Sequence, residues 1–431
     1  MDAVDTFNHE LCAFLDASPT PFHATEQMKQ HLLTAGYTLL NEADEWQLET
    51  GKGYIVTRND SSIIAFRLGN NPINEGIRMV GAHTDSPCLK VKPNAVIEKH
   101  GYWQLGVEVY GGALLAPWFD RDLSLAGRIS YQDSDGQLQH TLINFEEAIA
   151  FIPSLAIHLH RGVNDGHAIN AQNELPPVVM QADAGVQTFD VILKDQINKQ
   201  GEVRDCHAII DFELYFYATD KARIIGLQKD FLASARLDNL LSCFIGLKSL
   251  LNNTADYSTL LVCTDHEEVG SASACGAQGP FLESVLQRIS NDSATQLTRM
   301  LDASLMISVD NAHAIHPNYA DKHDSNHGPL LNSGAVIKVN ANQRYATNSE
   351  TSAIFKLLAA QAKQPVQTFV TRSDMGCGST IGPITSSEIG VRTVDIGVPQ
   401  WGMHSIRELA GSRDAYSLSK ILTEFWAKDR V

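Results

Sequence analysis

The segment Ile77-Arg78-Met79-Val80-Gly81-Ala82-His83-Thr84-Asp85 carries the pattern on which the fold prediction rests. A short apolar run at residues 77–82 is typical of a strand buried in a parallel sheet, and the metal-capable His83 follows it at once. Three later apolar runs are also followed by metal-capable side chains: residues 259–263 by Glu267 and Glu268, 305–309 by Asp310, and 391–396 by His404. The repetition predicts several buried strands that deliver polar groups to one edge of a sheet.

The spacing of apolar residues changes twice along the chain. Helical spacing at residues 7–15, 237–250 and 351–362 surrounds the apolar runs, which indicates an α/β domain with a mostly parallel sheet flanked by helices. Between about residues 93 and 232, alternating apolar residues predict a β-rich segment, with a hairpin turn at residues 133–136. We therefore predict one α/β domain, residues 1–92 and 233–431, interrupted by an inserted β-rich domain, residues 93–232.

Composition limits the partners of the chain. The 431 residues include 33 Lys and Arg against 50 Asp and Glu, a formal net charge of −17, and no run of basic residues. Such a chain is repelled by nucleic acids and by anionic membranes. The start of the chain does not resemble a secretion signal, and we expect a cytoplasmic protein. The seven cysteines are odd in number and scattered, which favours free thiols.

The polar groups that follow the strands predict a metal site. Ligands bind at the carboxyl ends of strands in open α/β sheets, and Asp238, at the start of a predicted helix, can reach the same edge. Histidine with several carboxylates suits Zn²⁺, with Mn²⁺ or Co²⁺ as alternatives. The surplus of ligands suggests two ions. Of the adjacent Glu267 and Glu268, one can bind metal while the other acts as a base.

Seven motifs spread over the chain resemble the M18 aspartyl aminopeptidase family. They are Ser18-Pro19-Thr20-Pro21-Phe22-His23, Gly81-Ala82-His83-Thr84-Asp85-Ser86-Pro87, Trp118-Phe119-Asp120-Arg121-Asp122-Leu123, Arg236-Leu237-Asp238-Asn239, Asp265-His266-Glu267-Glu268-Val269-Gly270-Ser271, Asn311-Ala312-His313-Ala314-Ile315-His316-Pro317-Asn318-Tyr319 and Met403-His404-Ser405-Ile406-Arg407-Glu408. The resemblance implies a zinc-peptidase-like α/β fold. It also implies an aminopeptidase that removes N-terminal Asp or Glu from peptides, using water activated by two zinc ions per subunit.

The resemblance also implies a role for each site residue. Asp238 would bridge the two zinc ions, His83 and Asp310 would complete one site, and Glu268 and His404 the other, with Glu267 as general base and Asp85 orienting the ring of His83. The matching substrate contacts are His313, Lys338 and Tyr345. A further histidine, His158, would come from a neighbouring subunit of a homo-oligomer, implied to be a dodecamer, through the inserted oligomerisation or lid domain. A zinc-ligand role for His158 stays open.

Other interpretations of the same residues were weighed. A related aminopeptidase with broad or neutral preference would carry the same metal ligands, and a catalytically idle binding or scaffold protein could share the fold. The histidines at positions 313, 316, 323 and 327 superficially suggest a separate zinc site, but no Cys pair or His-Glu-x-x-His pattern accompanies them. Because −17 repels acidic substrates at long range, an acidic preference needs a local cation, for which Lys338 is the candidate.

Overall fold

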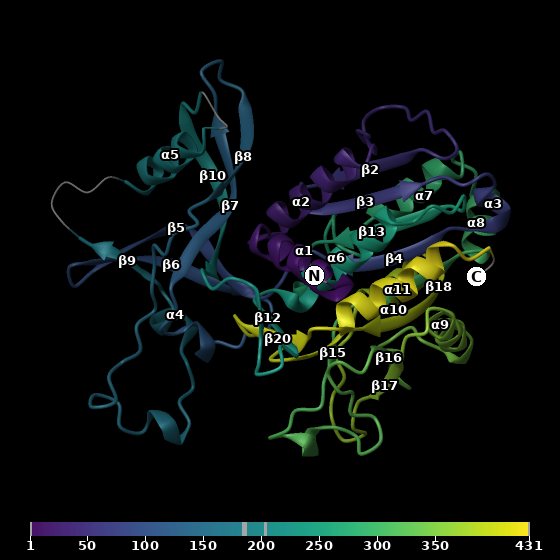
Figure 1. The fold of residues 1–431 in the computed structure, drawn as a ribbon. Helices are drawn as coiled ribbons and strands as arrows, with labels where there is room; N and C mark the ends of the chain where they lie inside the picture. The colour runs from purple at the N-terminus through teal and green to yellow at the C-terminus, as the bar shows by residue number, and fades with distance from the viewer. Residues whose placement is uncertain (1, 183–187, 202–204, 430–431) are drawn as a thin grey trace. The chain divides into compact units, whose positions relative to one another are not determined.

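The computed structural model describes residues 2–182, 188–201 and 205–429. Within them the chain forms two compact units: the first consists of residues 1–86, 222–403 and 408–431, and the second of residues 87–221 and 404–407. In the first unit, nine strands of the described residues make one sheet (Figure 1). In sheet order they are β1 (Thr38–Leu39), β2 (Gly53–Arg58), β3 (Ser62–Arg67), β13 (Thr259–Thr264), β4 (Arg78–His83), β14 (Leu305–Val309), β18 (Arg392–Gly397), β16 (Ala335–Val339) and β17 (Val366–Val370).

The sheet is parallel in its centre and mixed at its sides. The four adjacent strands β13, β4, β14 and β18 run parallel to one another. The pairs β2–β3, β3–β13 and β16–β18 are antiparallel. The predicted α/β class is confirmed, and the predicted run of parallel strands is its central part.

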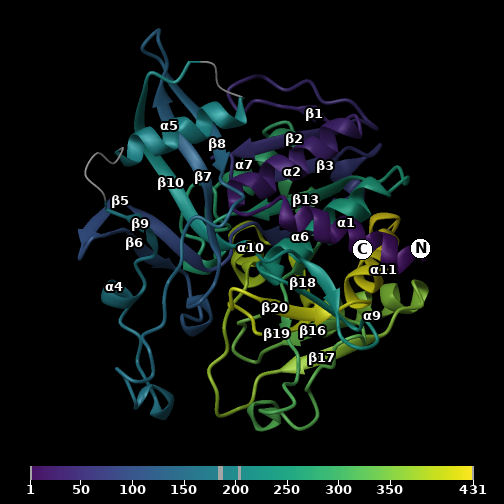
Figure 2. The ribbon, with the colours of Figure 1, turned by 60° about the vertical axis from the view of Figure 1, so that its left-hand side comes forward.

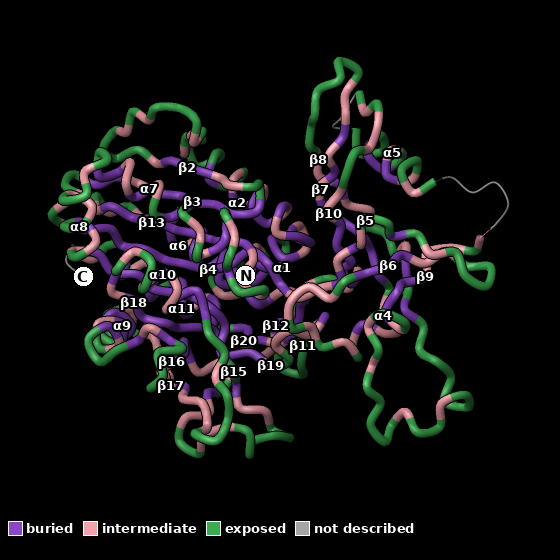
Figure 3. The backbone as a smooth tube through the Cα atoms, turned by 180° about the vertical axis from the view of Figure 1, so that it is seen from behind, coloured by how far each residue is buried: buried purple, intermediate pink, exposed green. Residues whose placement is uncertain are grey.

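Alternation along the strands divides the apolar core of the first unit into two layers. In β4, Val80 and Ala82 join the core under one group of helices, whereas Met79 joins the core on the other face. The first group is α1 (Ala3–Asp16), α2 (Pro21–Thr34), α6 (Leu237–Leu251), α9 (Ser349–Gln361) and α11 (Asp414–Trp426). The second is α7 (Phe281–Ile289), α8 (Ala294–Asp302) and α10 (Ile381–Ile389), beside the short α3 (Pro72–Glu75). Helices therefore cover both faces, and the central strands are buried (Figure 3).

The first unit also contains a smaller sheet, and some of its strands closely follow strands of the large sheet in the sequence. Its order is β11 (Arg223–Ile225), β12 (Phe231–Ser234), β20 (Glu408–Gly411), β19 (Pro399–Trp401) and β15 (Ala312–His313). Strand β15 begins two residues after Asp310, so this sheet holds the loop that leaves β14. A buried arginine, Arg78, donates to the carbonyls of Lys428 and Glu75 and so ties the chain end to β4.

The second unit contains an antiparallel sheet. Its order is β8 (Leu138–Asn144), β7 (Leu123–Gln132), β10 (Ala208–Ala218), β5 (Cys88–Lys99), β6 (Tyr102–Tyr110) and β9 (Val178–Gln181), and it also holds α4 (Ala171–Glu174) and α5 (Phe189–Gln200), the latter beside β8 and β10 (Figure 2). The predicted hairpin turn joins β7 to β8. Gly127 in β7 is required by close approach, because a Cβ there would lie 1.9 Å from the Glu213 carbonyl oxygen. Among the described residues, no helix is both long and apolar enough to span a membrane.

Candidate active site

Three neighbouring parallel strands bring polar residues to one edge of the large sheet. His83 is the last residue of β4, Asp310 follows β14, and Glu267 and Glu268 lie in a 3-10 turn shortly after β13. Because β13 and β14 pair with β4 on its two sides, their carboxyl ends meet. These residues come together as the sequence pattern predicted.

His83 lies at the centre of this cluster and is buried. Its Nε2 is 3.5 Å from Oδ1 of Asp238 and 3.7 Å from Oδ1 of Asp310. Its Nδ1 is 3.0 Å from the carbonyl oxygen of Asp85, which can only accept, so Nδ1 carries a proton. In the neutral ring, Nε2 then directs its lone pair toward the two carboxylates, as a metal ligand requires.

The first turn of α6 positions Asp238. The Asp238 N–H donates to Glu408 over 3.0 Å, and its carbonyl accepts from the Ser86 hydroxyl at 2.6 Å. The following residue, Asn239, donates to the Val309 carbonyl at the end of β14. The bond between Asp238 and Asn239 is cis. These contacts fix the helix start against the strand ends, and Glu408 is a site residue to which sequence reasoning gave no role.

Asp85 connects the two halves of the cluster. Its Oδ1 lies 3.3 Å from Nδ1 of His83, and its two carboxylate oxygens accept from the N–H groups of Glu267 and Glu268, each at 3.1 Å. Asp85 is fully buried. The predicted contact between Asp85 and the ring of His83 is present, and the same carboxylate also fixes the backbone of the paired glutamates.

Crowding of carboxylates dominates the electrostatics of the cluster. Burial, followed by the charge of Asp238, raises the pKa of Glu268 well above its usual value. Burial raises the pKa of Glu267 to about 7, although the charge of His83 acts in the opposite direction. Burial lowers the pKa of His83, but hydrogen bonds to three aspartates outweigh it and the net shift is upward. The site concentrates more negative charge than protein groups alone neutralise.

The donor set fits a divalent cation. One donor atom each from His83, Asp238 and Glu268 lie within 4.8 Å of one another, and Asp310 is adjacent. Imidazole nitrogen and carboxylate oxygen are ligands that zinc accepts, and a dication would relieve the repulsion among the carboxylates. The residues present therefore suit a zinc centre.

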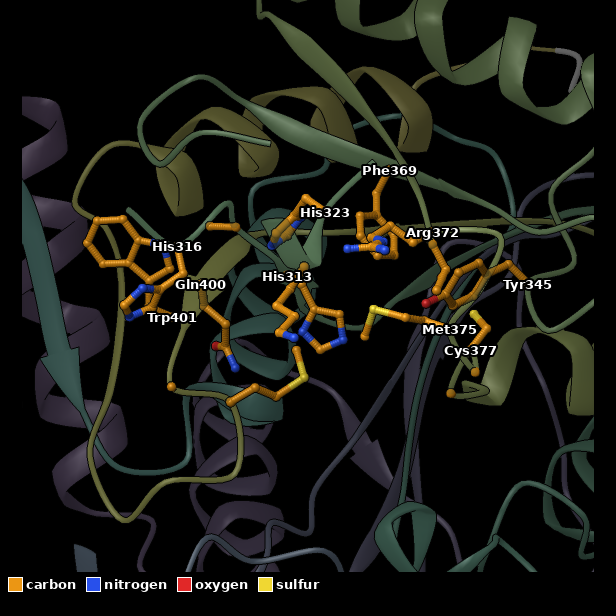
Figure 4. Close-up of a pocket in the computed structure, with 17 residues that line it drawn as sticks. His313, His316, His323, Tyr345, Phe369, Arg372, Met375, Cys377, Gln400 and Trp401 are labelled. Carbon is orange, nitrogen blue, oxygen red and sulfur yellow. The ribbon is translucent and has the colours of Figure 1, made fainter. Parts of the chain in front are cut away.

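The predicted substrate residues divide between the cluster and a pocket beside it. Lys338 is buried, and its Nζ lies 3.2 Å from Oδ2 of Asp310 and 3.3 Å from the Asn311 carbonyl. Tyr345 and His313 line a cavity of about 320 Å³ (Figure 4). Tyr345 connects the two, because its ring centre is 5.2 Å from Nζ of Lys338.

Most of the pocket wall is neutral. Aromatic and sulfur-containing side chains surround His313, among them Phe369, Met375, Cys377 and Trp401 (Figure 4). Desolvation lowers the pKa of His313, as does Lys338. Among the described residues two groups meet metal-ligand spacing, and neither includes the histidines at 313, 316, 323 and 327. The first three of these histidines line the pocket instead.

Two predicted site residues belong to the second unit. His404 has a positive φ of 67°, and its Nδ1 lies 3.1 Å from the carbonyl of Gly112. His158 is exposed in a loop at residues 155–159 that also exposes three apolar side chains, Leu155, Ile157 and Leu159. Their contribution to the site stays a prediction.

Sequence reasoning missed Asp395, whose carboxylate holds two segments that border the pocket. It is fully buried in β18, and its carboxylate accepts from the Thr380 hydroxyl at 2.7 Å and from the Ala346 N–H at 2.6 Å. These partners adjoin Tyr345 and the loop at 376–378, both of which line the pocket. A carboxylate between two apolar residues, Val394 and Ile396, in a buried strand was the signal in the sequence.

A layered α/β unit with a histidine and carboxylates at the ends of its parallel strands defines the class of metal-dependent hydrolases. The family model described as "Aminopeptidase I zinc metalloprotease (M18)" matches residues 14–426. The chain belongs to this M18 family and is accordingly a metallo-aminopeptidase, a hydrolase of the zinc exopeptidase type.

Similar proteins cover nearly the whole chain. A "Probable M18 family aminopeptidase 2" from Pseudomonas syringae pv. syringae is 60% identical over 98% of this chain and 99% of its own length. Its counterpart from Pseudomonas aeruginosa PAO1 is 58% identical over the same shares. Among solved structures, Chaetomium thermophilum mApe1 has a TM-score of 0.88 and 32% identity, covering 99% of both chains. An mApe1 dodecamer from S. cerevisiae has a TM-score of 0.85 and 28% identity, covering 98% of this chain and 96% of that one.

Proposed function

We propose that this M18 aminopeptidase removes N-terminal residues, preferably Asp or Glu, from peptides at a two-zinc centre. The observation that carries the proposal is the convergence of His83, Asp238, Glu268 and Asp310 beside Glu267. Asp238 would bridge the ions, with His83 and Asp310 completing one site and Glu268 and His404 the other. Mn²⁺ or Co²⁺ would be substitutes for zinc.

When bound, zinc would supply a Lewis acid for the scissile carbonyl and lower the pKa of a water molecule. Glu267 takes the proton of the attacking water and returns it to the nitrogen of the departing amine. The contact between its N–H and Asp85 holds Glu267 in place, while Asp85 also orients the ring of His83. The bond broken is the first peptide bond of the substrate.

A Glu267→Gln variant tests the role of Glu267. Glutamine keeps the shape but cannot accept the proton, so we expect kcat to fall by roughly 10²–10⁴-fold, with unchanged zinc content. Glu283→Gln, in helix α7, is a matched control that should keep full activity. Full activity in Glu267→Gln would overturn the catalytic assignment.

The acidic preference rests on Lys338 and on the pocket beside it. Lys338 is a buried cation close to Tyr345, and Tyr345 and His313 both line the pocket. The apolar character of much of the pocket wall favours the competing function, a broad or neutral aminopeptidase. Hydrolysis of aspartyl, glutamyl and leucyl anilides separates them, and faster leucyl turnover would refute the acidic preference. Lys338→Met should selectively reduce aspartyl turnover, whereas Lys356→Met, at an exposed position of helix α9, should not.

We also propose that the protein forms a homo-oligomer, a dodecamer. In it, the inserted unit would act in oligomerisation or as a lid, and would bring His158 to the active site of a neighbouring subunit. The exposed apolar residues around His158 support an interface there, as does the dodecamer of the S. cerevisiae relative. Mixing inactive Glu267→Gln and His158→Ala subunits should restore part of the activity if His158 acts in trans. A monomer in light scattering, or no restoration, would contradict the arrangement. Cytoplasmic location stays a prediction.

A further inference from the structure

A second cluster of metal-capable side chains lies in the first unit, next to the active-site turn along the chain. It consists of Asp265, His266 and Cys275, and it shares no side chain with the cluster around His83. One donor atom from each of the three residues lies within 4.8 Å of the others. Its donor atoms are therefore as close together as those of His83, Asp238 and Glu268 in the candidate catalytic site.

The imidazole of His266 is the centre of this second cluster. On one side of the ring, Nδ1 lies 3.5 Å from Sγ of Cys275, and on the other side Nε2 lies 3.5 Å from Oδ2 of Asp265. One ion binds only one ring nitrogen, and one donor atom from each of the three residues lies within 4.8 Å of the others. Tetrahedral zinc, with its usual bond lengths to sulfur and nitrogen, separates these two ligand atoms by roughly 3.5 Å. The sulfur and the nitrogen, which form a hydrogen bond with each other, are therefore also spaced as two ligands of one ion would be.

A hydroxyl group forms hydrogen bonds with both the nitrogen and the sulfur. Oγ of Ser273 is 2.8 Å from Nδ1 of His266 and 3.6 Å from Sγ of Cys275, and it accepts from the Gly276 N–H. The loop is built to hold these groups, since Asp265 is in turn fixed through its N–H to the Ser62 hydroxyl at 2.8 Å. His266 and Cys275 therefore lie in a loop whose conformation is fixed by hydrogen bonds.

Burial and access both suit a bound ion. Asp265 and Cys275 are each 4% exposed, whereas the His266 side chain is 28% exposed and leaves one side open. Burial raises the pKa of Cys275, but hydrogen bonds with His266 and Ser273 outweigh it, and the net shift is downward. Sulfur in the thiolate form is a ligand that soft cations bind.

We propose that Asp265, His266 and Cys275 form a second metal site, which takes a borderline or soft divalent cation such as Zn²⁺ or Cd²⁺. A thiolate sulfur distinguishes it from the catalytic cluster, which offers only nitrogen and oxygen. The proposal does not depend on the proposed function, because none of its three ligands belongs to the proposed catalytic set.

Cadmium titration of the full-length, metal-free protein tests the site. A cadmium–thiolate bond gives an ultraviolet charge-transfer band that a nitrogen and oxygen site cannot produce. We expect this band, at saturating cadmium, to reach the amplitude of one cadmium–thiolate bond per subunit, to vanish in Cys275→Ser, and to persist in Cys12→Ser, whose thiol lies in helix α1. No band in the wild type, or an unchanged band in Cys275→Ser, would overturn the proposal.

Two further measurements keep the test decisive if Cys275→Ser folds poorly. Asp265→Asn keeps the thiol and should weaken cadmium binding about tenfold or more, since it removes the charge of one ligand. In the wild type, cadmium should protect Cys275 from alkylation, measured by peptide mass spectrometry, while Cys12 reacts at an unchanged rate. Equal alkylation of Cys275 with and without cadmium would refute the site.

Discussion

Replacing Lys338 with methionine should destabilise the metal-free protein and yet tighten its hold on zinc. The Lys338 ammonium is buried against Oδ2 of Asp310 at 3.2 Å, and their side chains are 3% and 11% exposed. Removing one partner of such a pair leaves a buried charge uncompensated, which costs about 3–5 kcal/mol. Methionine keeps most of the volume, so the loss is mainly electrostatic.

Zinc changes this cost because Asp310 is a proposed ligand. In the zinc-loaded protein the carboxylate is already neutralised, and the substitution removes only the hydrogen bonds of Nζ, worth about 1 kcal/mol. The difference, about 2–4 kcal/mol, must appear in the metal equilibrium, because folding and binding form one thermodynamic cycle. Lys338→Met should therefore bind zinc roughly 30-fold to several hundred-fold more tightly, at 1.4 kcal/mol per tenfold.

Urea unfolding with chelator and with excess zinc gives the two stability changes, and competition with a chromophoric chelator gives the affinity. Lys322→Met is the control, since its side chain is 61% exposed and pairs with exposed Asp321. Equal destabilisation with and without zinc, or weaker zinc binding by Lys338→Met, would refute the proposed coupling of Lys338, Asp310 and the metal.

Three other perturbations follow from the structure. Gly127→Ala should lower the free energy of unfolding by about 3 kcal/mol or more, because its Cβ would meet the Glu213 carbonyl. Gly106→Ala, with its nearest atoms 3.4 Å away, is the control, and equal losses in the two would contradict this explanation. Burial, then the nearby arginine charge, lowers the pKa of His23 to about 4, so stability present above pH 6.5 should be lost toward pH 4. His23→Gln should remove this loss, about 3 kcal/mol of the free energy of unfolding measured across that range, and parallel curves would exclude His23 as its source. Asp395→Asn should lower the free energy of unfolding by about 2 kcal/mol and raise KM, because the Thr380 hydroxyl or the Ala346 N–H loses its acceptor. Unchanged stability in denaturant and an unchanged KM would contradict the positioning role of Asp395.

The local pattern of apolar and polar residues was sufficient to predict helices, strands and several site residues. The apolar run ending at His83 predicted a buried strand with a ligand at its end, and β4 ends at that residue. Likewise, the spacing of apolar residues predicted the helix that begins beside Asp238. These inferences succeed because strand and helix periodicities are properties of neighbouring residues.

The local sequence pattern did not predict contacts between segments that are distant in the sequence. The sequence suggested Lys338 as a cation for substrate, whereas the pairing of β16 with β18 and the loop after β14 place its ammonium against Asp310. Asp395 drew no attention, although it holds two segments that border the pocket.

The sequence by itself determined the class of fold, the family, and which side chains could bind metal. Only the tertiary structure decided which of these side chains meet, and it added the contact between His266 and Cys275. The physical reason is that strand order brings β13, β4 and β14 side by side, and loop conformation then selects the partners. Neither is encoded in the spacing of residues along one element.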